Sequence, residues 1–349
     1  MLDKIIARIR EPDPASMAAA RARQDTLTKP QGSLGRLEEL SIQLAGIYRQ
    51  PIPSIKDKVI VTMAGDHGVV AEGVSAFPQE VTPQMVYNFL NGGAAINVLA
   101  RHVGARIVVV DMGVASDFEP HPSLVVKKVA KGTANIAKGP AMTRAQAEQA
   151  LLAGVEVVEA EIERGLDIVG TGDMGIGNTT PSAAIAAALT GEPPDKIAGR
   201  GTGVDNEGLK RKISAIERAL AVNQPNPKDG LDVLAKIGGF EIGGLAGVIL
   251  GAAANGKPVM VDGFISTAAA MIAVAVAPAA RPYLISAHRS KEIGHGIMLD
   301  WLQLKPLFDL DMRLGEGTGA ALGISVAEAA CKILAEMATF GEAGVSEKE

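Results

Sequence analysis

Aromatic residues are scarce in this sequence, and its positive charges do not outnumber its negative charges. Phe, Trp and Tyr make up 3% of the 349 residues, and the formal net charge is −5. Proteins that hold a nucleic-acid backbone need a positively charged surface, and many add aromatic rings on which bases stack. Because the sequence offers neither feature, we do not expect nucleic acid as a partner.

Cysteines and closely spaced histidines are also rare. The only cysteine, Cys331, lies in "VAEAACKILAEM", whose apolar spacing is that of a buried helical face. We therefore expect a core residue there rather than a catalytic thiol. A single cysteine forms no disulfide within the chain, which fits a reducing cytoplasm. The histidines show no HxxxH or HExxH pairing, so the sequence predicts no metal site.

No hydrophobic run is long enough to predict a membrane span. The N-terminal segment "MLDKIIARIREPDP" carries charges throughout, unlike a secretion signal. The most apolar stretch, "FISTAAAMIAVAVAPAA", ends in proline before a transmembrane length is reached. We predict a buried helix there, no association with membranes and a cytoplasmic location.

What the sequence does contain is glycine, at 40 positions, and short aliphatic segments that alternate with helical patterns. Runs of about four to six aliphatic residues are typical of strands buried on both faces, and intervening helices imply parallel pairing. We therefore predict an α/β fold with a doubly wound, mostly parallel sheet of about six strands. A capping-box pattern at Thr143 and Gln146 predicts the start of a long helix. The segments expected to be extended are 58–64, 106–111, 124–129, 166–170, 258–263, 283–288 and 310–315.

Small, polar and charged residues follow the carboxyl ends of these predicted strands. In an open parallel sheet, ligands bind at that edge. We therefore expect distant segments of the chain to converge on one cleft, namely "GDHG", "GTGDMGIGNTT", "DG", "SAHRS" and "GEGTG".

Three glycine-rich turns predict a ligand that bears phosphate. Such turns let backbone N–H groups surround an anion, and a helix N-terminus adds favourable partial charge. Lys210, Arg211 and Lys212 follow the second turn. The alternative is that the glycines merely allow tight turns. The three turns are "GDMGIGNTT" (172–180), "GRGTGVD" (199–205) and "GEGTG" (315–319).

Two nucleotide-binding motifs fit poorly. "GAAANGKP" has P-loop spacing, but Pro258 replaces the required Ser or Thr and the segment runs from helix into strand. "GTGDMGIG" follows a strand, but its glycine spacing is wrong and no ribose-binding acid follows at the expected distance. An NAD-dependent oxidoreductase remains the alternative function.

Glu316 stands between two glycines near a predicted strand end. Its nearest basic residue is Arg313, which in a strand would point to the opposite face. A carboxylate in an apolar cleft has a raised pKa and suits a general base. A solvated loop carboxylate is the other interpretation. His67, after the first strand, is equally open to a structural or a catalytic role.

Taken together, eight motifs resemble the nicotinate-nucleotide:dimethylbenzimidazole phosphoribosyltransferase family. The resemblance extends from about Lys29 to the helix after Glu316. It rests on "KPQGSLGRLEEL", "AGDHGVVAEGVSAFPQEVTPQMV", "GTGDMGIGNTTPSAAI", "GRGTGVD", "GGFEIGGLAG", "VDGFISTAAA", "SAHRSKEIGH" and "LGEGTGAAL".

The resemblance implies transfer of the phosphoribosyl group of nicotinate mononucleotide to 5,6-dimethylbenzimidazole, with inversion at C1′ and release of nicotinate. The product, α-ribazole 5′-phosphate, is the lower-ligand nucleotide of cobalamin. No cofactor or metal is implied. A homodimer is implied, with a Rossmann-like large domain at 58–317 and a small helical domain built from 1–57 and 318–349. Which base is used in the cell is left open.

The resemblance also implies roles for individual residues. Glu316 would remove the benzimidazole N–H proton. Asp173 stands where the family often has glutamate and would favour a cationic transition state. Lys212 would contact phosphate or ribose, with Lys210 as the competing alignment. The phosphate would meet Gly175, Gly177, Asn178, Thr179, Gly201, Gly203 and Ser290; Arg313 would also contact substrate, and the aromatic base would meet Phe77, Pro78, Gln84 and Leu314, with Met85 as a marginal member.

Overall fold

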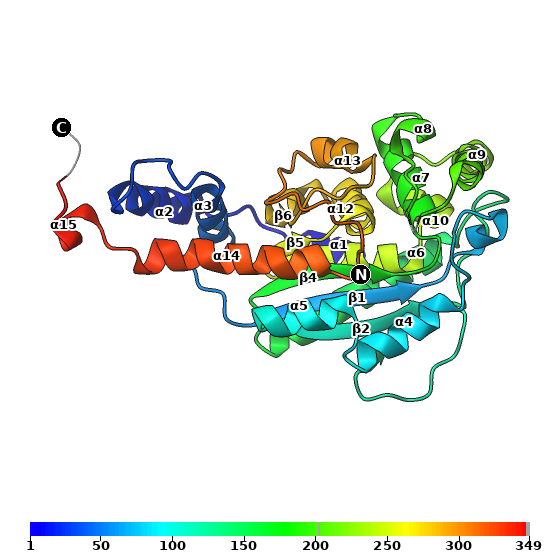
Figure 1. Ribbon diagram of the computed structural model, residues 1–349, viewed down its shortest axis with the longest axis horizontal. Helices are drawn as coiled ribbons and strands as arrows, with labels where there is room; N and C mark the ends of the chain where they lie inside the picture. The colour runs from blue at the N-terminus through cyan, green and yellow to red at the C-terminus, as the bar shows by residue number, and fades with distance from the viewer. Residues whose placement is uncertain (202, 347–349) are drawn as a thin grey trace.

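The computed structural model describes residues 1–201 and 203–346 (Figure 1). The strands found in these residues form one parallel sheet with the order β3-β2-β1-β4-β5-β6. The prediction of a mostly parallel sheet of about six strands is therefore confirmed. The strands are β1 (Lys58–Gly65), β2 (Arg106–Gly113), β3 (Leu124–Val126), β4 (Ile168–Met174), β5 (Val259–Val261) and β6 (Leu284–Ser286).

Helices precede, connect and follow these strands. The predicted capping box at Thr143 and Gln146 is present at the start of α6. The helices are α1 (Leu2–Ile6), α2 (Pro14–Thr26), α3 (Arg36–Tyr48), α4 (Val81–Leu90), α5 (Ala95–Val103), α6 (Arg144–Glu163), α7 (Thr179–Thr190), α8 (Pro194–Ile197), α9 (Asn206–Asn223), α10 (Gly230–Ile237), α11 (Phe240–Ala254), α12 (Phe264–Val276), α13 (His295–Leu302), α14 (Thr318–Glu336) and α15 (Phe340–Ala343), with 3-10 turns η1 (Gly68–Glu72) and η2 (Pro278–Tyr283).

Helices cover both faces of the sheet, which explains the unbroken aliphatic strands. In β1, Val59, Val61 and Met63 point into the core beneath α6 and α11. Ile60 and Ala64 point into the opposite core, beneath α4, α5 and α14. Because successive strand residues face opposite sides, both sets must be apolar. The predicted doubly wound arrangement follows from this packing.

Close contact between α6 and α11 depends on glycine. A Cβ atom added at Gly154 would collide with the carbonyl oxygen of Gly244, and one added at Gly247 would collide with that of Leu151. The two helix backbones therefore touch without intervening side chains. This packing gives a physical reason for the glycine-rich sequence of α11.

Gly154→Ala is expected to lower the free energy of unfolding by about 3 kcal/mol, since overpacking a well-packed core costs about 1–3 kcal/mol or more. The unfolding midpoint in denaturant measures the effect. Gly139→Ala is the control, because an added Cβ there has no atom within 4 Å. Equal midpoints for both variants would show that the α6–α11 contact is not tightly packed.

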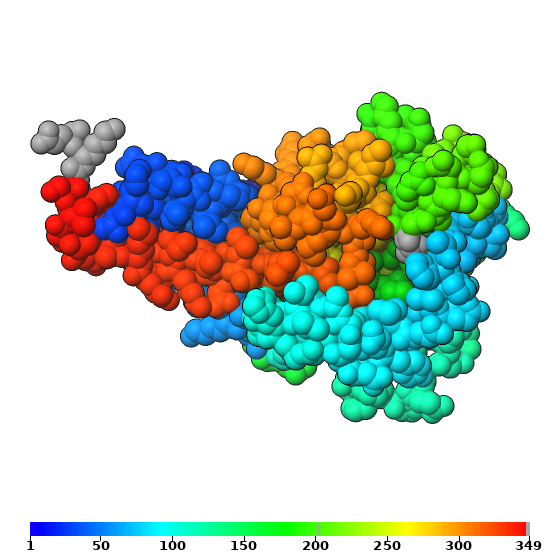
Figure 2. All heavy atoms as spheres, viewed as in Figure 1, coloured from blue at the N-terminus to red at the C-terminus, as the bar shows by residue number. Residues whose placement is uncertain are grey.

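Helices from the N-terminal and C-terminal parts of the chain pack together beside the sheet. Helices α2 and α3 pack together, and α3 packs on α14 (Figures 1 and 2). Arg23 donates hydrogen bonds to the carbonyl oxygens of Leu334 and Ala335. The first turns of α14 instead cover β4 and β5, and α1 packs on α11. The division into 1–57 with 318–349 and 58–317 stays a prediction, and 347–349 lie outside the described residues.

Two predictions about apolar segments can be compared with this packing. "FISTAAAMIAVAVAPAA" begins with the buried helix α12, and Cys331 is buried in α14, as expected. Among the described residues, α14 is the one helix long and apolar enough to cross a membrane. More than half of α14 is buried against the sheet and α3, so its length and apolar character are weak evidence for a membrane span.

The predicted strand at 310–315 is wrong. The segment is irregular, because Asp311 and Gly315 have φ angles of 56° and 84°, which an extended strand does not allow. The chain after β6 forms one isolated bridge just before this segment, between His288 and Phe308. The other predicted strands are present but differ at their ends: β3, β5 and β6 are shorter than predicted, whereas β1, β2 and β4 continue to Gly65, Gly113 and Met174. Asp173 therefore lies on a strand rather than in the loop after it.

Candidate functional site

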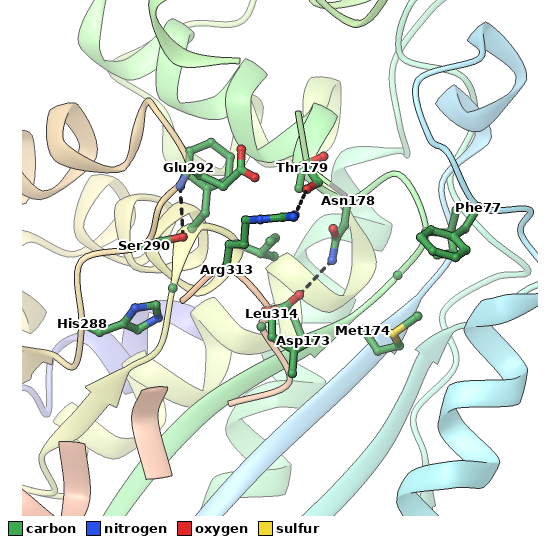
Figure 3. Close-up of a pocket in the computed structure, with 17 residues that line it drawn as sticks. Phe77, Asp173, Met174, Asn178, Thr179, His288, Ser290, Glu292, Arg313 and Leu314 are labelled. Atoms are coloured by element: carbon green, nitrogen blue, oxygen red, sulfur yellow. Dashed lines mark hydrogen bonds between the residues drawn. The ribbon is translucent and has the colours of Figure 1, made fainter. Parts of the chain in front are cut away.

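A cavity of about 260 Å³ opens at the carboxyl ends of the central strands (Figure 3). From β1 the chain builds the sheet toward β2 and β3, and it then crosses over to β4, β5 and β6. Ligands of doubly wound folds bind at such a switch point. The cavity is lined by Phe77, Asp173, Met174, Gly175, Ile176, Asn178, Thr179, Gly201, Gly263, Phe264, Ile265, His288, Ser290, Glu292, Arg313, Leu314 and Gly315.

Segments that are far apart in the sequence meet here, as the strand-exit argument predicts. The cavity wall combines β4 and the start of α7 with the loops after β5 and β6 and the segment before α14. Residues predicted to contact substrate that line the cavity are Phe77, Asp173, Gly175, Asn178, Thr179, Gly201, Ser290, Arg313 and Leu314.

Asp173 lies near the end of β4 with its carboxyl group buried. One oxygen accepts a hydrogen bond from the Asn178 side chain at 2.9 Å, and the other has no partner. Burial raises the pKa of Asp173 well above its ordinary value, and the nearby carboxylates of Asp262 and Glu241 raise it further. The Asp173 carboxyl group therefore holds its proton more tightly than an exposed aspartate does.

Glu316 lies next to the cavity, directly after the lining residue Gly315. Its side chain is 5% exposed, and one carboxylate oxygen accepts a hydrogen bond from the Ile96 amide at 3.3 Å. Burial raises the pKa of Glu316, although this hydrogen bond lowers it. The interpretation as a solvated loop carboxylate is therefore wrong. Glu316 is a buried carboxylate with a raised pKa, a property that suits a general base.

The two lysines that compete for the predicted phosphate contact, Lys212 and Lys210, lie in different environments. Lys212 is 1% exposed, and its Nζ donates to the Thr179 hydroxyl at 3.0 Å and to the Gly199 carbonyl at 3.1 Å. Burial lowers the pKa of Lys212 to about 8, and Glu292 opposes this shift. Lys210 points to solvent and pairs with Glu207. Of these two lysines, Lys212 is the one that contacts a residue lining the cavity.

Arg313 approaches the same part of the cavity from the opposite wall. Its guanidinium donates to the Gly201 carbonyl at 2.8 Å. With Lys212 behind Gly201, two cationic side chains flank one glycine-rich turn. The amide groups at the start of α7 add partial positive charge nearby. This end of the cavity has the donors and charge that a phosphate group needs.

Some predicted contact residues lie outside the cavity lining. Pro78 and Gln84 are exposed near its mouth, and Met85 is half-buried on α4. Gly177 has a φ of 87° and packs on Val70, so its role in the turn is conformational. Gly203 also has a positive φ, of 110°, and lies beyond the part of the turn that lines the cavity.

Glu292 is a lining residue that our sequence reasoning missed. Its side chain is buried, and one carboxylate oxygen has no hydrogen-bond partner. Burial raises its pKa, while Lys212 and Arg313 lower it. Its place two residues after Ser290, past a strand end, was the available signal. The other lining residues that we did not predict are Met174, Ile176, Gly263, Phe264, Ile265, His288 and Gly315.

His67 has a structural environment. Its Nε2 lies 2.7 Å from a Glu241 carboxylate oxygen, and both side chains are fully buried. Although burial lowers the pKa of His67, the Glu241 carboxylate raises it above its ordinary value. His67 does not line the cavity, so the geometry favours a supporting role. Within 1–201 and 203–346, no three His, Cys, Asp or Glu side chains are grouped to hold a metal ion.

Comparisons with known proteins agree with this site. A family model described as phosphoribosyltransferase matches residues 9–345. Two relatives named nicotinate-nucleotide–dimethylbenzimidazole phosphoribosyltransferase come from Roseiflexus sp. (strain RS-1) and Chloroflexus aggregans. They are 63% and 60% identical to this chain, with all of this chain and 99% of each relative covered.

A solved structure is also similar. The crystal structure of nicotinate-nucleotide–dimethylbenzimidazole phosphoribosyltransferase from Thermus thermophilus is 49% identical in sequence and has a TM-score of 0.92. The match covers 96% of this chain and all of that structure. None of these similarities supports the alternative of an NAD-dependent oxidoreductase.

Proposed function

Because the chain belongs to the phosphoribosyltransferase family that matches it, we propose that it transfers the phosphoribosyl group of nicotinate mononucleotide to 5,6-dimethylbenzimidazole. The products are nicotinate and α-ribazole 5′-phosphate, which serves cobalamin biosynthesis. The observation that carries this proposal is the buried Glu316 carboxylate beside a cavity with a cationic end. The reaction needs both features, a base for a ring N–H and a cradle for a phosphate.

The proposed proton acceptor is Glu316. One nitrogen of dimethylbenzimidazole attacks C1′ of the ribose while the Glu316 carboxylate takes the proton from the other nitrogen. The C1′–nicotinate bond breaks on the opposite face, which inverts the configuration. Nicotinate leaves with its ring nitrogen neutral, so the electrons of the broken bond return to that ring. Gly315 and Gly317 leave space for the rings because they carry no side chains.

The proposed phosphate site is the cationic end of the cavity. Lys212 and Arg313 neutralise the phosphate, and backbone amides with the hydroxyl groups of Thr179 and Ser290 donate hydrogen bonds. Lys212, Arg313 and Thr179 all lie close to Gly201, which supports the assignment. The proposed phosphate site also includes Gly175, Gly177, Asn178 and Gly203.

Asp173 is proposed to favour the cationic transition state at C1′. Burial raises its pKa. Nicotinate mononucleotide brings a positively charged pyridinium ring into the cavity, and a nearby positive charge favours the ionised carboxylate. The nucleotide thus shifts Asp173 toward the charged form that the transition state needs.

The base site is proposed at the cavity mouth. Phe77 and Leu314 line the cavity there, and these two large apolar residues are 49% and 58% exposed. Such surfaces suit a flat aromatic ring that covers them on binding. Pro78 and Gln84 complete the proposed base site. A homodimer, a cytoplasmic location and the small helical domain of residues 1–57 with 318–349 are part of the same proposal.

One assay tests the function. The purified protein is incubated with nicotinate mononucleotide and a panel of bases, and released nicotinate is followed by chromatography. We expect release with dimethylbenzimidazole and formation of the α-nucleotide. Nucleotide binding without turnover with any base would indicate a non-catalytic carrier instead. Tight NAD binding in a fluorescence titration, without nicotinate release, would indicate an oxidoreductase.

A further inference from the structure

Asp262, in the "VDGF" segment after β5, has no part in the reaction described above, yet it is fully buried beneath the Glu316 loop. Its Oδ2 accepts a hydrogen bond from the Gly317 amide at 3.1 Å, and its Oδ1 accepts one from the Ala320 amide at 3.0 Å. Both oxygens thus bind a segment more than fifty residues away in the sequence.

These hydrogen bonds replace a missing helix cap. Helix α14 begins at Thr318, and its N-cap residue, Gly317, has no side chain that could accept from the first amides. Unpaired amides at a buried helix start are unfavourable. Asp262 satisfies them from the loop after β5, with one carboxyl oxygen for each amide.

The backbone of Glu316 needs such support. Its φ angle is 64°, in the left-handed region between Gly315 and Gly317. This conformation is unfavourable for a non-glycine residue and persists only where surrounding contacts hold it.

Three contacts hold the loop. The Glu316 amide donates to the Asp173 carbonyl at 3.2 Å, and the Thr62 hydroxyl donates to the Glu316 carbonyl at 3.0 Å. The third contact is that of Asp262 with the next amide, at Gly317. Among these contacts, only the third comes from a side chain that also accepts a second amide of the same segment, that of Ala320.

The space around Asp262 leaves it little freedom. The Nε2 atom of His288, whose ring lines the cavity, lies 3.8 Å from its Oδ1. A Cβ atom added at Gly319 would come within 2.8 Å of the same oxygen and would collide with the His288 ring. Asp262 is therefore clamped between the cavity wall and the Glu316 loop.

We propose that Asp262 is a positioning residue for phosphoribosyl transfer, because its hold on the Gly317 and Ala320 amides sets the direction of the Glu316 carboxylate. This inference rests on the proposed function. Asp262 does not line the cavity and touches no reacting atom; it acts through Glu316. A displacement of a catalytic group by about 1 Å can cost about 10²-fold in rate.

The first test is Asp262→Asn. The amide group has one acceptor oxygen, so one backbone amide loses its partner while the side-chain shape is kept. We expect kcat to fall about 10²-fold, and KM for nicotinate mononucleotide to stay within about twofold because the phosphate end is untouched. Ser266→Ala is the matched control, a buried hydroxyl without a partner in α12, and it should keep wild-type kcat.

The second test combines Asp262→Asn with Glu316→Gln. If Asp262 acts through Glu316, its substitution adds no further loss to kcat in the Glu316→Gln background. A further loss as large as in the wild-type background would overturn the positioning role. Wild-type kcat in the folded single variant would overturn it as well.

Gly319→Ala serves if Asp262→Asn does not fold. The added methyl group would collide with the His288 ring and push the Asp262 carboxylate aside, but the carboxylate itself is chemically unchanged. Alanine suits a helix. We expect the same loss of kcat at nearly constant KM, and wild-type kcat in this folded variant would overturn the inference. Wild-type protein that releases no nicotinate with any base contradicts the proposed function. Wild-type turnover with an unaffected Asp262→Asn variant contradicts only the positioning role.

Discussion

Glu316→Gln is expected to lower kcat by about 10²–10⁴-fold, which is the usual contribution of a positioned general base. In the wild-type protein the Ile96 amide donates to the Glu316 carboxylate at 3.3 Å. Glutamine has nearly the same shape and still offers an oxygen to this amide. The substitution also removes a charge from a buried position. The thermal unfolding midpoint should therefore not fall, so a loss of rate reports chemistry rather than unfolding.

The pH dependence of kcat gives an independent measurement for Glu316. A base must be ionised to accept a proton, and burial raises the pKa of Glu316. As the pH falls through this raised pKa, the carboxylate is protonated and kcat of the wild-type protein declines. Glu316→Gln should lack this decline.

Glu336→Gln is the matched control for Glu316→Gln, because Glu336 is an exposed residue at the end of α14. It should keep both kcat and the pH profile of the wild-type protein. Near wild-type turnover by Glu316→Gln, with product followed by chromatography, would show that another group takes the proton.

Lys212→Met is expected to lower kcat/KM for nicotinate mononucleotide by about 10²-fold, because a hydrogen bond to a charged group contributes about 1.5–3 kcal/mol and the phosphate also loses a charge partner. Methionine fills a similar volume, so the buried site keeps its packing. Steady-state rates at varied nucleotide concentration measure the effect. Lys210→Met is the control, since Lys210 lies two residues away in α9 and points to solvent.

The pH profile of kcat/KM tests Lys212 without a mutation. Burial lowers the pKa of Lys212 to about 8 in the free protein. The lysine is positively charged below this pH and neutral above it, so nucleotide binding should weaken as the pH rises through about 8. Lys212→Met should lack this alkaline decline. An alkaline decline that persists in Lys212→Met would assign it to another group.

Particular segments show how far the sequence predicts the fold. The strands at β1 and β2 were predictable because "KVIVTMA" and "RIVVVD" are aliphatic on both faces, a pattern typical of the centre of a doubly wound sheet. The segment 310–315 contains leucine and methionine and was wrongly predicted as a strand. Its conformation depends on two positive φ angles and on the lack of a partner strand, and local composition reports neither.

The candidate site shows the same division. Glycine-rich turns and polar strand exits predicted a convergent cleft, and the cavity joins them. Two features of the cavity could not be read from the pattern. The acid Glu292 lies in a stretch with an ordinary mixture of charges; its place past a strand end is shared with neighbouring residues, and burial is what distinguishes it from solvated acids. Lys212 and Lys210 are equivalent in sequence, and the helix rotation alone decides which one is buried.

By itself, the sequence determined the α/β class, the edge of the sheet where a ligand binds and the residue types that gather there, because periodicity and turn chemistry are local properties of the chain. The tertiary structure alone decided the protonation tendencies and the supporting contacts. Burial shifts the pKa values of Glu316, Asp173 and Lys212. Asp262 reaches the Glu316 loop from the distant segment after β5. Both effects arise because the fold removes certain groups from water and brings distant segments together. Local sequence patterns do not report which distant segments will meet.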